Sequence, residues 1–187
     1  MELTNQQTLP VGQAEAWAAL NDIALLQACI PGCESITPTG DNAYDVALMA
    51  AVGPVKARFK GKLKLADLNP PDSYALQFEA QGGPAGHGKG TAQVKLQPQG
   101  PMQTLLHYQV QASVGGKVAQ IGSRLVDMAA QKMAGEFFDN FTAKLQERHP
   151  APAAAAAAPA PGTAEDRPGP AGRLLAWLRR LFGGAKA

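Results

Sequence analysis

The sequence predicts an α+β fold in which an antiparallel sheet wraps around one long C-terminal helix. Between residues 34 and 114, apolar side chains recur at every second position in six runs separated by Gly- and Pro-containing turns. This pattern is typical of hairpin-linked strands with one buried face. From Val118 to Leu145 apolar residues recur at every fourth position, which predicts a helix. Because all the strands precede this helix, we expect a sheet covered by a helix and not alternating β-α units.

The first thirty residues predict an edge strand followed by two short helices. Residues 2–9 are polar and extended, and residues 13–20 have the apolar spacing of a short helix. Asn21 and Asp22 are good N-cap residues for a second helix, which Pro31-Gly32 ends. Two short helices are therefore expected between the first and second strands.

Six strands follow, and the one over residues 55–65 is the clearest because strict alternation continues for eleven residues. Its apolar residues share one face, and the other face carries Lys56, Arg58, Lys60, Lys62 and Lys64. One face is therefore buried and the other solvated. Several inward positions of the sheet are small, namely Ala50, Ala57, Gly61, Ala80, Ala92 and Ala112. Small residues opposite a long helix indicate either a cavity or a core that packs large side chains against small ones.

The charge is divided unequally along the chain. Residues 1–147 hold eleven Lys or Arg and thirteen Asp or Glu, a formal charge of −2, whereas residues 148–187 hold six basic and two acidic residues, a charge of +4. The body therefore lacks the charge of a nucleic-acid binder. The first ten residues have no signal-peptide pattern, and no run of eighteen apolar residues occurs. We therefore expect a cytoplasmic protein.

The C-terminal forty residues predict a linker and a membrane-binding helix. Residues 148–170 are rich in Ala and Pro, which predicts a flexible, extended chain. In residues 171–187, the segment AGRLLAWLRRLF would form an amphipathic helix that binds membranes through Arg173, Leu174, Leu175, Trp177, Leu178, Arg179, Arg180, Leu181 and Phe182. Twelve helical residues span about 18 Å, less than the roughly 30 Å of a bilayer core. We therefore expect this helix to lie in the interface on the inner face of the cell membrane; the alternative is that it docks on the body or on a partner protein.

Four stretches of the body carry a family resemblance. They are CIPGCE at residues 29–34, GPVKA leading to FKG at residues 53–61, the glycine-rich stretch around Ala85-Gly86, and VGGKVAQIGSRL at residues 114–125. Together they resemble the CoxG family of carbon monoxide dehydrogenase subunits, which belongs to the START-like (SRPBCC) helix-grip superfamily. The resemblance implies a START-like domain over residues 1–147 whose sheet and helix enclose an apolar ligand.

The same resemblance implies a non-catalytic accessory protein without a metal or a covalently bound cofactor. Its implied ligand is a lipid-like molecule, with menaquinone or ubiquinone as the natural candidates. Its implied partner is a molybdenum-containing CO dehydrogenase or related hydroxylase, recruited to the membrane so that electrons reach the quinone pool. The expected pocket residues are Tyr44, Leu48, Phe59, Leu63, Leu76, Phe78, Val94, Leu106, Tyr108, Val110, Ile121, Leu125 and Met128. The alternatives are a START-like enzyme, such as a cyclase or hydrolase, and an assembly or maturation factor with a filled core.

Other residues with chemical potential have competing structural explanations. Residues 83–90 come within one residue of a P-loop, but Gly90 occupies the position where Ser or Thr would hold Mg²⁺, and a strand pattern follows. We expect a hairpin at the pocket rim, with a ligand gate as the functional alternative. Cys29 and Cys33 form either a metal or redox half-site or, as we favour, Cys29 is a small apolar residue at a helix end and Cys33 begins a strand. The three histidines lie apart in the sequence and predict no catalytic site.

Two further sets of residues leave the choice between structure and function open. Tyr44, Tyr74 and Tyr108 have polar tips on the inner face of the sheet. One of them would hydrogen-bond a quinone carbonyl, or each would reach a backbone group within the core. The basic face of residues 56–64 is either a solvated surface or a docking surface for an acidic partner.

Overall fold

The computed structural model describes residues 1–150, so the predicted tail helix and the predicted linker beyond residue 150 lie outside the described residues. The elements are, in chain order, β1 (Glu2–Leu9), α1 (Gln13–Leu20), α2 (Ile23–Cys29), β2 (Cys33–Gly40), β3 (Ala43–Val52), β4 (Val55–Asn69), β5 (Ser73–Gln81), the 3-10 turn η1 (Gly83–Ala85), β6 (His87–Gly100), β7 (Gln103–Gly115), α3 (Lys117–Gln120) and α4 (Ser123–Arg148).

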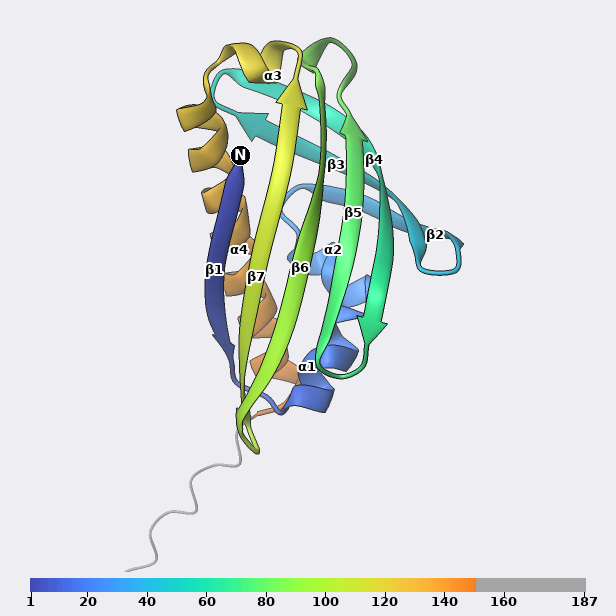
Figure 1. The fold of residues 1–187 in the computed structure, drawn as a ribbon, viewed down its shortest axis with the longest axis vertical. Coiled ribbons are helices and arrows are strands. Elements are labelled where there is room, and N and C mark those ends of the chain that lie inside the picture. The colour runs from blue at the N-terminus through green and yellow to red at the C-terminus, as the bar shows by residue number, and fades with distance from the viewer. Residues whose placement is uncertain (151–187) are drawn as a thin grey trace, which may run out of the picture. The chain divides into compact units, whose positions relative to one another are not determined.

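The strands form a single antiparallel sheet in the order β1-β7-β6-β5-β4-β3-β2. Strands β2 to β7 are joined by successive hairpins, and β1 pairs with β7 to become one edge. Helices α1, α2 and α4 lie on the same face of the sheet (Figure 1). The predicted α+β fold, with a sheet folded over one long C-terminal helix, is therefore confirmed. Within residues 1–150, no helix is both long and apolar enough to cross a membrane.

The long helix predicted from Val118 to Leu145 is interrupted near its start. The structure has a short helix α3, a break at Gly122, and then α4 from Ser123 to Arg148. Gly122 has a φ of +95°, a conformation that glycine adopts readily and that other residues avoid. The prediction of one continuous helix was wrong because apolar spacing continues across this break.

Contacts at both ends of α2 hold it against α4. Asp22 caps α2 as predicted, since its carboxylate accepts a hydrogen bond from the backbone N–H of Leu25 at 3.1 Å. Arg148, the last residue of α4, lies 2.6 Å from the other carboxylate oxygen of Asp22. At the other end of α2, the Asn140 side chain donates to the carbonyl of Cys29 at 3.1 Å. The hydrogen bond from Arg148, followed by that from Leu25, holds the pKa of Asp22 below its ordinary value.

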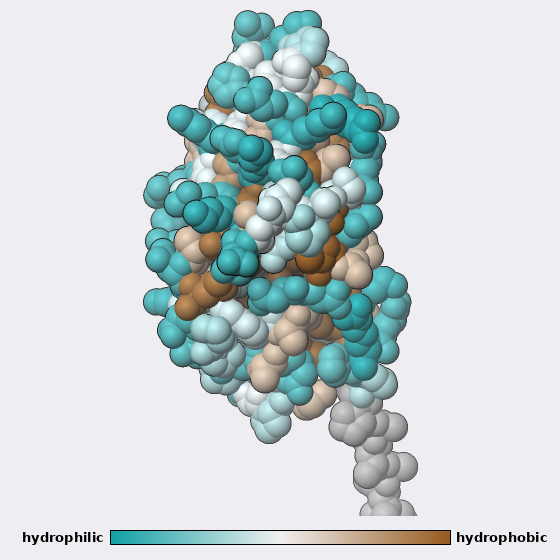
Figure 2. All heavy atoms as spheres, turned by 90° about the vertical axis from the view of Figure 1, so that its right-hand side faces the viewer, coloured by the Kyte–Doolittle hydropathy of each residue, from teal (hydrophilic) through white to brown (hydrophobic). Residues whose placement is uncertain are grey.

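The inward-facing side chains of the sheet are buried to different degrees. On β6 and β7, Val94 and Leu106 are buried, whereas Leu48 and Phe59 on β3 and β4 are only half-buried. On one side of the molecule, apolar surface shows between hydrophilic side chains (Figure 2). The half-buried apolar residues of β3 and β4 therefore have room beside them.

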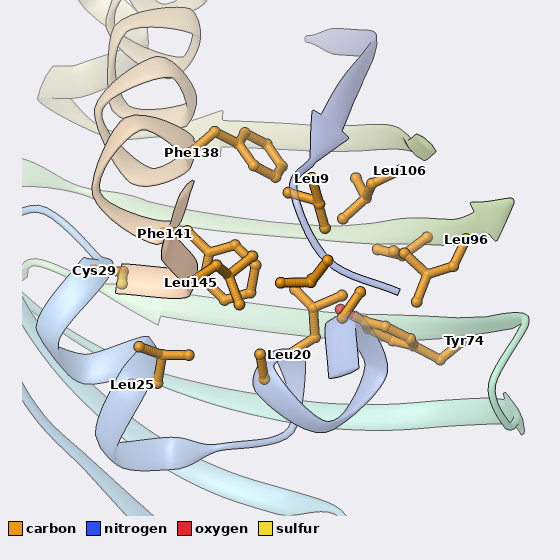
Figure 3. Packing of buried hydrophobic residues seen from close by; sticks show 14 residues of the cluster. Leu9, Leu20, Leu25, Cys29, Tyr74, Leu96, Leu106, Phe138, Phe141 and Leu145 are labelled. Atoms are coloured by element: carbon orange, nitrogen blue, oxygen red, sulfur yellow. The ribbon is translucent and has the colours of Figure 1, made fainter. Parts of the chain in front are cut away.

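The hydrophobic core lies where α1, α2 and the second half of α4 meet the sheet (Figure 3). Leu25, Phe141 and Leu145 are among its most deeply buried side chains. Thr104 is buried there too, and its hydroxyl donates to the carbonyl of Val11 at 2.9 Å. The first half of α4 contributes no residue to this cluster, although Val126 there is buried, so the main core lies at the second half of α4.

Candidate functional site

A cavity of about 420 Å³ lies between the inner face of the sheet and the helices. Strands β2 to β7 supply one wall, α2 and its junction with α1 supply another, and Phe137 and Phe138 of α4 complete the lining. Small-molecule sites in proteins typically measure about 300–1,000 Å³ and are mostly apolar. The volume and the lining of this cavity therefore suit a small apolar ligand.

Most of the predicted pocket residues line this cavity. Those in the lining are Tyr44, Leu48, Phe59, Leu63, Leu76, Phe78, Val94, Leu106, Tyr108 and Val110. Ile121, Leu125 and Met128 are not in the lining, and the latter two are 42% and 58% exposed. The row of residues spaced four apart rotates by about 40° per step around the helix. A row that faces the core at Phe141 has consequently turned away from it by Leu125.

Several lining residues were not among the predicted set. Ile23, Leu26 and Ile30 come from α2, and Phe137 and Phe138 come from α4. The apolar spacing of α2 showed that this helix had a buried face. It did not show what that face covers, because the packing partner of a short helix depends on the path of the whole chain.

Small residues on the sheet help to keep this space open. Gly61, Ala80 and Ala92, three of the predicted small inward positions, all line the cavity. A Cβ atom on Gly61 would lie 2.6 Å from the backbone carbonyl oxygen of Glu79 on the neighbouring strand. The absence of a side chain at Gly61 therefore serves close backbone packing as well as cavity volume.

Few polar side chains reach the cavity. Lys62 and Glu79 border it, but they alternate with inward-facing residues, so their side chains belong to the outer face of the sheet. The Asn21 amide is already engaged, since it donates to the carbonyl of Trp17 at 2.8 Å. Among the described residues, no histidine or cysteine occurs in the lining. Over residues 1–150, no cluster of three or more His, Cys, Asp or Glu is suited to hold a metal.

Two of the tyrosines in the lining are packed against aromatic rings. Tyr74 lies edge-on to Trp17 with ring centroids 5.6 Å apart, and burial raises the pKa of its hydroxyl. Tyr108 stacks on Phe138 at 5.1 Å. Burial also raises the pKa of Tyr108, and hydrogen bonding with the Asn5 side chain partly offsets this rise. Both tyrosines are therefore neutral near pH 7.

The glycine-rich stretch is mostly a strand and not a loop. The chain turns through η1, and β6 begins at His87, so Lys89 and Gly90 lie within a strand. A phosphate loop needs a helix directly after the lysine, and that geometry is not present here. The predicted hairpin is confirmed, whereas its role as a gate stays a prediction.

The two cysteines are free thiols. Cys29 is fully buried in the core cluster, and Cys33 is half-buried at the start of β2. Burial raises the pKa of both thiols, which keeps them protonated and weakly nucleophilic at neutral pH. Cys29 therefore behaves as the small apolar residue that the sequence indicated.

The basic face of β4 is exposed but partly neutralised. Arg58 forms a salt bridge with Glu34, and Lys62 is directly opposite Asp45 and Glu79 on the adjacent strands. The cations of this face without an acidic residue opposite them are Lys56, Lys60 and Lys64. Both explanations of this face, solvation and docking to an acidic partner, fit these contacts.

The model of the CoxG family of carbon monoxide dehydrogenase subunits matches residues 7–146 of the chain. A solved structure of a conserved protein from Geobacillus kaustophilus is 29% identical, with a TM-score of 0.75 over 79% of this chain and 96% of that one. A START superfamily protein from Mycobacterium smegmatis is 10% identical, with a TM-score of 0.61 and coverages of 79% and 98%. The Zhui aromatase/cyclase from Streptomyces sp. R1128 is 12% identical, with a TM-score of 0.59 and coverages of 81% and 96%. The comparison with curated proteins found no match. These structures confirm the expected START-like fold.

Proposed function

The chain belongs to the CoxG family of carbon monoxide dehydrogenase subunits, and from this membership we propose that it is an accessory protein of a molybdenum-containing CO dehydrogenase or related hydroxylase. In this proposal it holds a respiratory quinone, menaquinone or ubiquinone, and brings the partner enzyme to the membrane. The observation that carries the ligand-binding part is the apolar cavity of about 420 Å³ between the sheet and the helices.

The residues around the cavity fit a quinone. The ring and the isoprenoid chain of a quinone are apolar, and its two carbonyl oxygens accept hydrogen bonds. Phe59, Phe78 and Phe138 offer aromatic surfaces for the ring, and tyrosine hydroxyls offer donors for the carbonyls. When bound, a quinone would supply an acceptor for two electrons, while the residues of this chain would bind it, orient it and exclude water.

The membrane part of the proposal rests on the amino-acid sequence of residues 171–187. Their apolar and basic residues are spaced for an amphipathic helix on an anionic membrane. The Ala- and Pro-rich residues 148–170 would leave the body free to meet a partner enzyme. Each basic residue near the membrane surface contributes roughly 1 kcal/mol to the free energy of membrane binding. Because these contributions are small, we propose a reversible attachment to the inner face of the cell membrane.

The ligand is tested by purifying the full chain from native membranes and extracting it with organic solvent. Mass spectrometry should find quinone in a stoichiometric amount. A chain that yields no quinone and also fails to bind added quinone would refute the carrier function. An added quinone that is recovered chemically altered, without the partner enzyme, would favour the enzymatic alternative.

The membrane attachment is tested by ending the chain after residue 150. We expect the shortened protein to leave the membrane fraction and appear in the soluble fraction. A full-length variant with Leu175, Leu178 and Leu181 replaced by Ser should behave in the same way, because it keeps the charge and loses the apolar face. Membrane association that survives both changes would contradict the proposed anchor.

A further inference from the structure

Tyr74 lines the cavity and is 9% exposed. Its ring extends from β5 toward the interior of the core cluster, with the hydroxyl oxygen at the inner end (Figure 3). Within the part of the chain that the structure describes, no residue hydrogen-bonds this hydroxyl, and burial alone accounts for its raised pKa. The fully enclosed side-chain oxygens that lack a partner are those of Asp127 and Thr142. The Tyr74 oxygen is not among them, so it is not fully enclosed. The residue borders both the cavity and a groove on the outer face of the sheet, and its ring points inward (Figure 3), which puts the hydroxyl on the cavity side.

The other two tyrosines of the lining differ from Tyr74 in the burial and the surroundings of their side chains. Tyr108 is half-buried and lies directly opposite Asn5 on β1, whose side chain partly offsets the rise in its pKa that burial causes. Tyr44 is only half-buried, so water reaches it more easily than it reaches Tyr74, which is 9% exposed. Of the three tyrosines, Tyr74 is the most deeply buried, and its hydroxyl has no hydrogen-bond partner among the described residues. An unpaired buried donor is unfavourable, and an acceptor oxygen supplied by a ligand removes this penalty.

The charge of the lining indicates which kind of ligand oxygen can accept a hydrogen bond from Tyr74. Lys62 is the only basic residue that residues 1–150 contribute to the lining, and it alternates to the outer face of the sheet. A carboxylate at the buried end would therefore have no cation to pair with, and burying an unpaired charge is strongly unfavourable. A carbonyl oxygen needs only one donor, which Tyr74 provides.

We propose that Tyr74 is a specificity-determining residue that donates a hydrogen bond to a neutral carbonyl oxygen at the buried end of the ligand. This inference rests on the proposed function and deepens it. The polar head of the ligand lies beside Tyr74 in the interior, and its apolar chain extends toward the more exposed Tyr44. Quinones fit this description, whereas fatty-acid anions do not.

The test compares the full-length wild-type chain with Tyr74→Phe and with the control Thr91→Val, which removes a hydroxyl from the outer face of the same sheet, outside the cavity lining. The probes are decylubiquinone, menadione and palmitate, titrated by calorimetry. We expect Tyr74→Phe to weaken binding of at least one quinone by about five- to tenfold, the effect of one neutral hydrogen bond. Thr91→Val should change the affinity less than twofold, and palmitate should bind no variant. Infrared spectra should show one carbonyl band of the bound quinone at lower frequency in the wild type than in Tyr74→Phe.

A second measurement separates ligand recognition from a structural role. Without ligand, Tyr74→Phe should melt at the same temperature as the wild type or higher, because it removes an unpaired buried hydroxyl. A lower melting temperature would show that the hydroxyl serves the core, and would overturn the inference. Equal quinone affinity of wild type and Tyr74→Phe, or tight palmitate binding, would overturn the inference alone. A wild-type chain that binds neither quinone would refute the proposed function and this inference together.

Discussion

Replacing Ala92 by Leu tests whether the space between the sheet and the helices exists in solution. Ala92 and Ala19 are both 6% exposed, but only Ala92 lines the cavity. Ala19 lies in the closely packed core cluster. The same substitution at these two positions therefore places the same extra atoms once into open space and once into occupied space.

The expected effects have opposite signs. At position 92, three additional carbons enter a cavity of about 420 Å³. At about 0.8 kcal/mol for each buried carbon, they raise the free energy of unfolding by up to roughly 2 kcal/mol. At position 19 they overpack the core, which lowers the free energy of unfolding by about 1–3 kcal/mol. About 1 kcal/mol corresponds to roughly 2–4 °C in a protein of this size, so a gain of about 2 kcal/mol at position 92 and the loss at position 19 should separate the two melting temperatures by about 6–20 °C.

The assay is thermal unfolding of both full-length variants, with and without decylubiquinone. Ala92→Leu should also reduce the rise in melting temperature that the quinone causes in the wild type, because its side chain occupies the ligand space. If Ala92→Leu is destabilised as much as Ala19→Leu, the cavity is not open in solution. The assignment of a ligand to this space would then be refuted.

Three further substitutions test other contacts. Thr104→Val leaves the buried carbonyl of Val11 without its donor, so urea unfolding should show a loss of about 1–3 kcal/mol; an unchanged midpoint would contradict the burial of this hydrogen bond. Asp22→Ala removes the cap of α2 and the contact with Arg148, and should cost about 0.5–2 kcal/mol at pH 7. The pKa of Asp22 is lowered from an ordinary value of 3.8, so its contribution is complete above about pH 4 and is lost as the pH falls through the folded-state pKa. A difference between wild type and variant that is the same at pH 7 and pH 2.5 would contradict this assignment. Gly61→Ala places a Cβ 2.6 Å from the backbone oxygen of Glu79 and should lower the urea midpoint by an amount equivalent to about 1–3 kcal/mol. An unchanged urea midpoint would mean that β4 and β5 move apart easily at this point.

The parts of the fold with a strict period could be predicted from the sequence. Alternation over residues 55–65 placed the inner and outer faces of β4 correctly, because a strand has no other way to separate apolar from basic side chains. The cap at Asp22 was also visible, because it depends on chemistry within three residues. Local signals of this kind do not require knowledge of the tertiary structure.

The side chains that the first half of α4 exposes could not be predicted in the same way. Leu125 continues the row of apolar residues spaced four apart, but both Leu125 and Met128 are exposed, just after the break at Gly122. The surroundings of Tyr74 were equally hidden, because the sequence shows an inward-facing tyrosine without showing which groups lie near its hydroxyl. Long-range packing decides both questions.

The partial separation of the core from the cavity has a consequence for how this fold can diversify. Within residues 1–150, seven of the eight largest fully buried side chains do not border the cavity, and Leu106 is the exception. Substitutions at half-buried positions such as Leu48 and Phe59 can therefore reshape the ligand space and leave most of the packing that holds the chain together intact. Evolution can change the ligand of such a protein in small steps without passing through unfolded intermediates, and protein engineers can use the same positions to select new ligands.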